Sequence, residues 1–475
     1  CGGDDDDGTG DDGTGDDGST DDGTGDDGTG DDGTGDDGTG DDGTGDDGTG
    51  DDGTSTGDEL DGTLRIGLIQ DFSNVLTLYG QMTTGGFLSG LAYKGDTDPL
   101  ETRDEVDHST SVGDLDIEIF QADSELNPDT ASTVATDLVQ QDDVDILFGT
   151  VLSDSANRVI NTVIDRTDVP FIAGPAAADS ITADAGTCGV QVYRANENTG
   201  MDARSGGVFI AEETDIERIA LYGNPGAFGQ AVRRGYRKVL EARGVEVVEN
   251  RSTPQGFAEW GQLLQEAEDR GAQAIVGGYT AATLGNLTTE IITGDWDLRF
   301  FGGFATALTL GIVGDTLQSE LDPYTEEAIL DSGFGPFTTR YHWNQYDNGI
   351  NQDFVDMHLD TWGTVPDLFT SGSFTAASSI IQAVQQEGEV SREAFIEQLP
   401  GMEVTDTPKG ENGYLYQEYD GQARSAMTIA NAVPSDTEGW SPAVQPGEPL
   451  ATVSRDETTT PNDDPDHSCD LTDQR

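Results

Sequence analysis

Residues 64–70, Leu-Arg-Ile-Gly-Leu-Ile-Gln, form a short apolar run that is typical of a strand buried on both faces of a parallel sheet. The pattern then turns helical over 80–93. Strand-like and helical segments go on alternating, with strands predicted at 115–121, 145–148 and 169–173 and helices at 128–141 and 153–166. Such alternation predicts a parallel sheet with helices on both faces.

The alternation starts again near Asn196, which predicts a second α/β unit of similar size. Its expected helices cover 200–213, 228–243, 260–270 and 284–293, and its expected strands cover 218–222, 245–248, 274–277 and 299–302. The following segments predict a strand-like stretch at 335–343, helices at 351–362, 374–387 and 392–399, and a β-hairpin made of 413–419, Gly421 and 426–432. The last 35 residues, rich in Pro and Asp, are expected to be a surface tail.

The composition is strongly acidic, with 93 Asp and Glu against 22 Lys and Arg and a net charge of −71. Residues 1–61 hold 25 of these acids and no basic residue, so the rest of the chain still has 68 acids against 22 bases. Such self-repulsion is tolerable near molar salt, where screening acts within roughly 3 Å. We therefore expect an extremely halophilic source. The charge excludes nucleic acid as a partner, because phosphates need a basic footprint.

The N-terminal residues 6–55 repeat a five-residue unit of the type Asp-Asp-Gly-Thr-Gly. Glycine with like charges favours an open coil, so residues 1–61 are interpreted as an acidic leash. Calcium is the alternative. However, calcium loops space their carboxylates at alternate positions, and the paired aspartates here do not match that pattern. The sequence predicts no metal site and no cofactor.

The cysteines are Cys1, Cys188 and Cys469. Cys1, followed by Gly-Gly and a polar stretch, resembles a lipid-modified first residue left after removal of a signal peptide; a truncated chain is the alternative. No apolar run reaches the roughly 18 residues that span a bilayer. Cys188 and Cys469 are then an even pair, for which either a disulfide or two free thiols is possible. Asn250 and Asn286 permit glycosylation without arguing for it.

Several motifs in order along 63–435 resemble the type I periplasmic binding proteins, and more narrowly the branched-chain amino-acid binding proteins of ABC importers. They are Ile66-Gly67-Leu68, Leu78-Tyr79-Gly80-Gln81, Asp142 to Gly149 with Ser153, Val169 to Pro175, Val192-Tyr193-Arg194, Gly226-Ala227-Phe228-Gly229, Gly277-Gly278-Tyr279 and Phe301-Gly302-Gly303. The resemblance implies an α/β fold of two Rossmann-like lobes with parallel sheets, joined by a three-crossover hinge. Lobe one would comprise 63–197 and 333–402, lobe two 198–332 and 403–435, and the tail 436–475.

Ligands of open α/β sheets bind beyond the carboxyl ends of the strands, which points to a cleft between the lobes. The loops expected there are 71–79, 150–155, 174–179, 224–228, 279–282 and 303–306. The resemblance implies that Ser153, at a helix N-terminus, holds a ligand carboxylate; capping its own helix is the alternative. Tyr79 and Tyr279 match the family's cleft aromatics, with packed loop aromatics as the alternative. Further candidates are Ala176, Ala178, Phe228 and Phe304.

Two positions depart from the amino-acid binders. Ala178 stands where they usually have a ligand-contacting Thr, and Phe304 stands where they have the Glu that neutralises the ligand ammonium. Burying an ammonium without a carboxylate is costly. Either Asp71 or Asp179 takes over that role, or the ligand is an amide, a carboxylate or a more apolar, aromatic compound.

An enzyme is not expected. Gly223 to Gly229 has the spacing Gly-x-x-Gly-x-x-Gly rather than that of a dinucleotide-binding loop, which disfavours a Rossmann-type oxidoreductase. A nucleophile elbow is missing, and the four histidines lie outside the predicted cleft loops. We expect a lipid-anchored protein on the extracellular face of the membrane, which captures a small solute by hinge closure and delivers it to an ABC permease. A ligand-binding sensor of the same fold is the alternative. Ligand identity and oligomeric state stay open.

Overall fold

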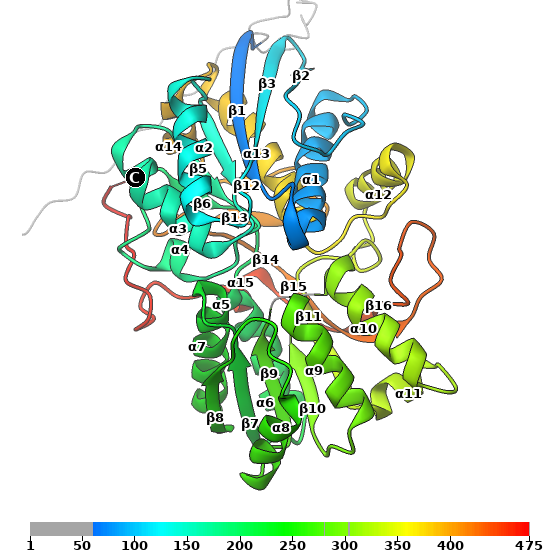
Figure 1. Cartoon of the computed structure of the whole chain (residues 1–475). Helices are drawn as coiled ribbons and strands as arrows, with labels where there is room; N and C mark the ends of the chain where they lie inside the picture. The colour runs from blue at the N-terminus through cyan, green and yellow to red at the C-terminus, as the bar shows by residue number, and fades with distance from the viewer. Residues whose placement is uncertain (1–59, 280, 303–304, 475) are drawn as a thin grey trace, which may run out of the picture. The chain divides into compact units, whose positions relative to one another are not determined.

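The computed structural model describes residues 60–279, 281–302 and 305–474. Cys1, nearly all of the predicted leash and Phe304 therefore lie outside the described residues. These described residues form two lobes, each built on its own central sheet (Figure 1). In the described part of the chain, no helix is long and apolar enough to cross a membrane.

Lobe one is built on a sheet whose strand order is β2 (His108–Val112), β3 (Leu115–Asp123), β1 (Gly62–Gln70), β4 (Ile146–Gly149), β5 (Phe171–Ala173) and β6 (Val192–Arg194). The predicted parallel pairing is confirmed: Ile66 of β1 pairs with Ile119 on one side and Ile146 on the other. Only the edge pair β2–β3 is antiparallel among the described strands of this sheet. The strand β2 was not predicted.

The helices of lobe one cover both faces of its sheet. They are α1 (Thr77–Gly95) after the short η1 (Asn74–Leu76), α2 (Pro128–Gln140), α3 (Ser153–Thr162), η2 (Ile164–Arg166), α4 (Ser180–Ala183), α12 (Gly349–Trp362), α13 (Thr370–Glu387) and α14 (Arg392–Gln398). Leu64, Ile66 and Leu68 share a core with α1 and α13, whereas Ile69 packs with α2 and α3. The apolar run at 64–70 is thus buried on both faces, as predicted.

Lobe two is built on a sheet whose strand order is β16 (Val444–Val453), β15 (Met427–Pro434), β11 (Phe334–Thr339), β10 (Arg299–Gly302), β9 (Ala274–Gly278), β7 (Arg218–Gly223) and β8 (Glu246–Ser252). The strands from β11 to β8 run parallel, and β15 and β16 are antiparallel additions at one edge. The helices are α5 (Thr199–Asp202), η3 (Ala203–Gly207), α6 (Val208–Glu213), α7 (Ala227–Ala242), α8 (Trp260–Asp269), α9 (Ala281–Thr293), α10 (Ala307–Glu320) and α11 (Glu326–Asp331).

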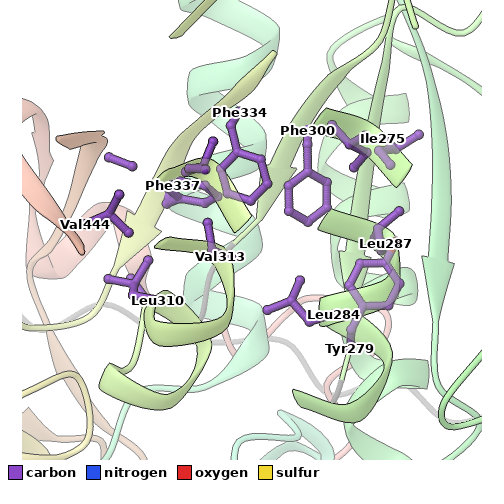
Figure 2. Close-up of a cluster of buried hydrophobic side chains, with 14 of the residues drawn as sticks. Ile275, Tyr279, Leu284, Leu287, Phe300, Leu310, Val313, Phe334, Phe337 and Val444 are labelled. Atoms are coloured by element: carbon purple, nitrogen blue, oxygen red, sulfur yellow. The ribbon is translucent and has the colours of Figure 1, made fainter. Parts of the chain in front are cut away.

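One face of the lobe-two sheet packs an aromatic core against α8, α9 and α10 (Figure 2). Phe300 lies at its centre, with its ring centroid 5.1 Å from Phe334 and 6.3 Å from Tyr279. This core continues into Leu76, Tyr79 and other residues of lobe one, so it supports the contact between the lobes as well as lobe two itself.

Two segments lie in a different lobe from the expected one. β11 pairs with β10 and β15, so residues 334–339 belong to the sheet of lobe two, not to lobe one. The small sheet of β12 (Glu403–Val404), β13 (Tyr414–Tyr416) and β14 (Ala423–Ser425) packs on the core of lobe one, not on lobe two. Sequence order alone does not reveal which sheet a short strand joins, because long-range pairing decides it.

The C-terminal region contains more structure than the predicted surface tail. Residues 444–453 form β16, which pairs antiparallel with β15, and α15 (Arg455–Thr458) follows. The predicted hairpin is only partly right: its first strand contains β13, but β13 pairs with β14, whereas the predicted second strand at 426–432 lies in β15, which pairs with β11 and β16 in the sheet of lobe two. The structure also contains a disulfide between Cys188 and Cys469, which are 281 residues apart in sequence.

Candidate functional site

A pocket lies where loops of both lobes meet, at the carboxyl ends of the parallel strands. Its lining comes from the segments after β1, β4, β5, β7 and β9 and from the residue before α13: Leu76, Tyr79, Val151, Leu152, Ser153, Pro175, Ala177, Phe228, Tyr279 and Phe369. This is the position expected for a ligand of an open parallel sheet. None of these lining residues carries a charge.

Ser153 brings a polar group into this lining. It is the first residue of α3 and is almost fully buried. Leu152, not Ser153, occupies the N-cap position, so the alternative that Ser153 caps its own helix is wrong. Its Oγ instead accepts a hydrogen bond from Ala178 N at 3.0 Å. This contact uses the Ser153 oxygen as an acceptor, so the hydroxyl hydrogen can still be donated to another group at the N-terminus of α3.

Two tyrosines, one from each lobe, line the pocket. Tyr79 packs edge-on against Phe369 with centroids 4.9 Å apart, and its hydroxyl accepts from Thr306 Oγ1 of lobe two at 3.1 Å. Tyr279 packs edge-on against Trp260 at 5.6 Å. Its buried hydroxyl has no hydrogen-bond partner within the described part of the chain. A buried hydroxyl without a partner costs about 1–3 kcal/mol, which a ligand acceptor would recover.

Neither acid that the sequence offered as a substitute for the missing Glu lines the pocket. Asp71 Oδ1 accepts from Ser124 Oγ at 2.8 Å and from Leu126 N at 2.5 Å. Asp179 forms an ion pair with Arg234 of lobe two. Both carboxylates are therefore directed into protein contacts, and no described lining residue supplies a carboxylate for a ligand ammonium.

The structure brings together four of the predicted site residues, namely Tyr79, Ser153, Phe228 and Tyr279. Ala176 and Ala178 are buried beside the pocket without lining it, and Ala177 between them does so. Phe304 lies outside the described residues. The remaining lining residues fall in the predicted cleft loops except Phe369, for which the sequence has no local signal.

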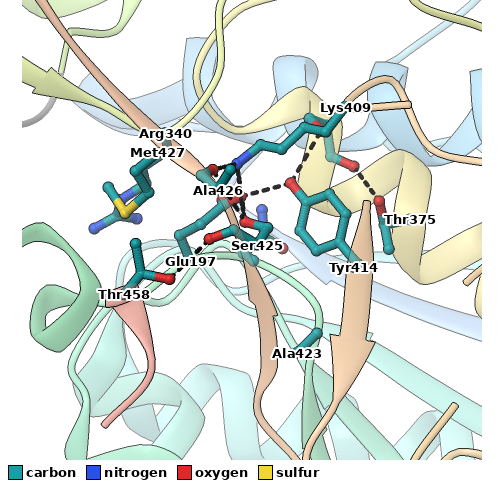
Figure 3. Close-up of polar contacts among 12 residues, drawn as sticks. Glu197, Arg340, Thr375, Lys409, Tyr414, Ala423, Ser425, Ala426, Met427 and Thr458 are labelled. Atoms are coloured by element: carbon teal, nitrogen blue, oxygen red, sulfur yellow. Dashed lines mark hydrogen bonds and ion pairs between the residues drawn. The ribbon is translucent and has the colours of Figure 1, made fainter. Parts of the chain in front are cut away.

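Buried polar contacts join the chain passages between the lobes (Figure 3). Glu197, between β6 and α5, accepts hydrogen bonds from Lys409 Nζ at 2.6 Å, Tyr414 OH at 2.5 Å and Ser425 Oγ at 2.8 Å. Lys409 also donates to the carbonyl of Ala426, between β14 and β15, at 2.6 Å. We call this set the hinge network.

A second buried pair extends the hinge network to the remaining passage between the lobes. Arg340, directly after β11, donates to Asp202 at 3.1 and 2.6 Å. Burial raises the pKa of Glu197, but Lys409 and the hydrogen bonds outweigh burial and hold that pKa below its ordinary value. Glu197 is therefore ionised at neutral pH, and its charge depends on Lys409.

Because the carboxyl group of Asp71 is buried, we expect the stability of the protein to depend on pH. Burial raises its pKa from 3.8 to about 6, although Ser124 and Leu126 oppose the shift. The folded state then binds more protons than the unfolded state, so this group's contribution to stability falls as the pH rises from about 4 to about 6. A shift of about two units corresponds to about 3 kcal/mol. We expect Asp71→Asn to be up to that much more stable at pH 8 and little changed at pH 4.

Denaturant unfolding at both pH values and fixed salt measures this difference. Exposed Asp98 provides the control, because Asp98→Asn removes the same charge without relieving a buried carboxylate. Equal stabilisation of both variants at pH 8 would show that net charge, rather than burial of Asp71, is responsible.

The comparisons with known proteins agree with this geometry. Residues 63–438 match the model of the periplasmic binding protein family, and the chain belongs to that family. The leucine-, isoleucine-, valine-, threonine- and alanine-binding protein of Pseudomonas aeruginosa is 22% identical over 354 residues, which cover 74% of this chain and 86% of the relative. The relatives are solute-binding proteins, not enzymes.

Solved structures show the same fold. A branched-chain amino acid transporter protein of Rhodopseudomonas palustris aligns with a TM-score of 0.64 at 21% identity, covering 84% of this chain and 98% of that chain. A solute-binding protein of the same species, in complex with 4-hydroxybenzoate, aligns with a TM-score of 0.65 at 17% identity, covering 83% and 98%. The fold is therefore that of the type I periplasmic binding proteins, as predicted.

Proposed function

We propose that the chain is the extracytoplasmic substrate-binding protein of an ABC importer and that it captures a small organic carboxylate with an apolar or aromatic body. The observation that carries the proposal is the pocket lining, which is uncharged and largely apolar and has Ser153 at a helix N-terminus. Delivery of the ligand to a permease follows from the family and is part of the proposal.

The pocket favours a carboxylate over a free amino acid. A ligand carboxylate is assigned to the N-terminus of α3 and the Ser153 hydroxyl, where the helix dipole and free N–H groups stabilise an anion. The apolar body lies between Tyr79, Phe228 and Phe369, and a polar substituent reaches the Tyr279 hydroxyl. An amino acid would bring an ammonium without a carboxylate partner into this lining, which is costly. The related protein that binds 4-hydroxybenzoate supports this choice.

Hinge closure is the proposed mode of capture. Lobe one binds first through Ser153, and lobe two then closes with Phe228 and Tyr279. Contacts between the lobes support a closed form: Asp179 pairs with Arg234, and Ala227 N at the start of α7 donates to Asp154 at 3.4 Å. Because the ligand contacts both lobes only when they are closed, binding shifts the population toward that form.

A thermal-shift comparison in molar salt tests the ligand class. The panel contains benzoate, 4-hydroxybenzoate, leucine and leucinamide at equal concentrations. A ligand present at 100 times its Kd adds roughly 2.7 kcal/mol of stability. We expect the two aromatic acids to raise the Tm most. A larger shift with leucine would overturn the carboxylate assignment while leaving the fold and family untouched.

Ser153→Ala is expected to weaken binding of the best aromatic acid by about tenfold to a hundredfold, because a hydrogen bond to a charged group contributes roughly 1.5–3 kcal/mol. Titration calorimetry measures the affinity. Ser155→Ala is the matched control, since Ser155 is a buried serine of the same helix outside the lining. Equal affinities of the two variants would show that Ser153 does not contribute to ligand binding.

We propose that the protein is anchored to the membrane by a lipid on Cys1. Detergent-phase partition of the protein from its native host tests this. Partition is expected to be lost in a Cys1→Ser variant with binding unchanged. Partition that persists in this variant would contradict the anchor.

We also propose that the protein works near molar salt. The support is the excess of 68 acidic over 22 basic residues beyond residue 61. The Tm is expected to rise steadily from 0.1 M to 2 M KCl, because screening relieves repulsion between like charges. A Tm that is constant over this range would contradict a halophilic protein.

A further inference from the structure

The C-terminal segment runs from one lobe to the other. It leaves lobe two at the end of β16, passes through α15, and reaches lobe one at Cys469. There the Cys469 N–H and the Ser468 N–H both donate to the carbonyl of Ala183, at 3.1 and 2.8 Å. We call residues 454–471 the strap.

The disulfide makes the lobe-one end of the strap covalent. Cys188 lies between α4 and β6, both elements of lobe one. Since β16 belongs to the sheet of lobe two, the disulfide creates a further covalent connection between the lobes. The other connections are the chain passages at 195–198, at 340–348 and at Ala426.

The middle of the strap is held on lobe two by ion pairs. Asp464, whose side chain is only 8% exposed, pairs with Lys238 of α7 and with Arg204 of η3, the latter at 3.3 Å. Asp466 pairs with the same lysine at 2.9 Å. The lysine belongs to a basic cluster at 233–238 that contains four of the 22 Lys and Arg residues, which makes this part of α7 an exception on an acidic chain.

The number of residues between the two attachments sets how far the attached parts of the lobes can separate. Cys469 lies five positions after Asp464, so α7 and the lobe-one end of the strap stay within about 17 Å of each other. Without the ion pairs, the nearest attachment on lobe two is the end of β16 at Val453, because Arg455 and Thr458 contact the small sheet on lobe one, through Glu403 and the Ser425 carbonyl. Those contacts are noncovalent, and once they break, the sixteen positions from Val453 to the disulfide at Cys469 span about 50 Å when extended.

We infer that the strap limits how far the lobes open. The disulfide fixes its end to lobe one, and Asp464 with Lys238 and Arg204 sets the short working length. This inference rests on the hinge closure proposed above, but not on any ligand. Opening of the unliganded protein is therefore the quantity to measure.

Double electron–electron resonance on the full chain provides that measurement. Nitroxide labels are placed on Asn161→Cys of α3 and Gln265→Cys of α8, both exposed positions, in a Cys1→Ser background. Relative to this parent, the Cys188→Ser/Cys469→Ser variant is expected to show a broader distance distribution with its mean at least 5 Å longer. Asp464→Asn, which keeps the disulfide, is expected to shift the mean in the same direction by a smaller amount.

Asp473→Asn is the matched control, because Asp473 is an exposed acid beyond the strap. The inference is overturned if the double-serine variant, folded by circular dichroism, has the distance distribution of the parent. It is equally overturned if Asp464→Asn moves the distribution no further than Asp473→Asn. Should the double-serine variant not fold, the Asp464→Asn comparison decides alone. Two lobes that never open in any variant, the parent included, would also contradict the hinge closure under the proposed function, whereas an unchanged distribution in a parent that does open would overturn the strap alone.

Discussion

Lys409→Met is expected to destabilise the protein by about 3–5 kcal/mol, because it leaves the Glu197 carboxylate buried without its cation. Both side chains of the pair are at most 1% exposed, so water does not compensate the lost charge. The substitution also removes the donor to the Ala426 carbonyl. Denaturant unfolding in molar salt measures the loss.

Two further variants assign the effect to the ion pair. Lys409→Met/Glu197→Gln is expected to recover much of the stability, since no unpaired charge remains. Lys94→Met serves as the comparison, because the pair of Lys94 with Asp406 is more exposed, at 12% and 29%, and is expected to contribute about 1 kcal/mol or less. Equal losses for Lys94→Met and Lys409→Met would show that the buried position of Glu197 is immaterial.

Gly80→Ala has the other large expected effect, in this case on both stability and binding. A Cβ at this position would lie 2.0 Å from the backbone oxygen of Asp71, and backbone atoms cannot move aside as a flexible side chain can. The start of α1 must therefore shift away from the end of β1. Overpacking of this kind costs about 1–3 kcal/mol and occasionally more. Tyr79 moves with the helix, so we expect aromatic acid affinity to fall at least tenfold.

Gly311→Ala is the control for this prediction. A Cβ on Gly311 of α10 meets nothing within 4 Å, and alanine in a helix is favoured over glycine by roughly 0.5–1 kcal/mol. We expect this variant to gain stability and keep its affinity. Thermal unfolding measures the stability of both variants, and calorimetry measures their affinity for the aromatic acid. A Gly80→Ala protein that binds like the parent would show that α1 adjusts freely. Lobe two has the same arrangement, with Gly229 against the backbone of Asn224.

The parts of the fold that the sequence predicted are those with local periodic signals. The run at 64–70 and the other parallel strands alternate with amphipathic helices. The pattern of apolar residues in each segment predicts which of its faces is buried. The β16 strand was missed because Pro446, Pro449 and Glu448 interrupt any strand pattern, which an edge position tolerates. The lobe assignment of β11 was wrong because its neighbours in the sheet are distant in sequence.

The same reasoning explains what was found of the site. Tyr79, Ser153, Phe228 and Tyr279 follow buried strands, and the carboxyl ends of parallel strands meet at one edge of each sheet. Phe369 does not follow a strand, so nothing in its surroundings indicates the pocket. The hinge network could not be predicted from the sequence either, because Lys409 and Glu197 are 212 residues apart and come into contact only in the folded protein.

The outer strand β16 also has a consequence for handling the protein. Its two prolines lack N–H groups and Glu448 adds a charge, so this border of the sheet is a poor template for another chain. Trimming the C-terminus at residue 436 would remove β16 and expose β15, Met-Thr-Ile-Ala-Asn-Ala-Val-Pro, whose backbone groups would then seek new partners. Such a shortened protein would tend to self-associate or aggregate, whereas one ending after Val453 would keep β16 as the cover of β15.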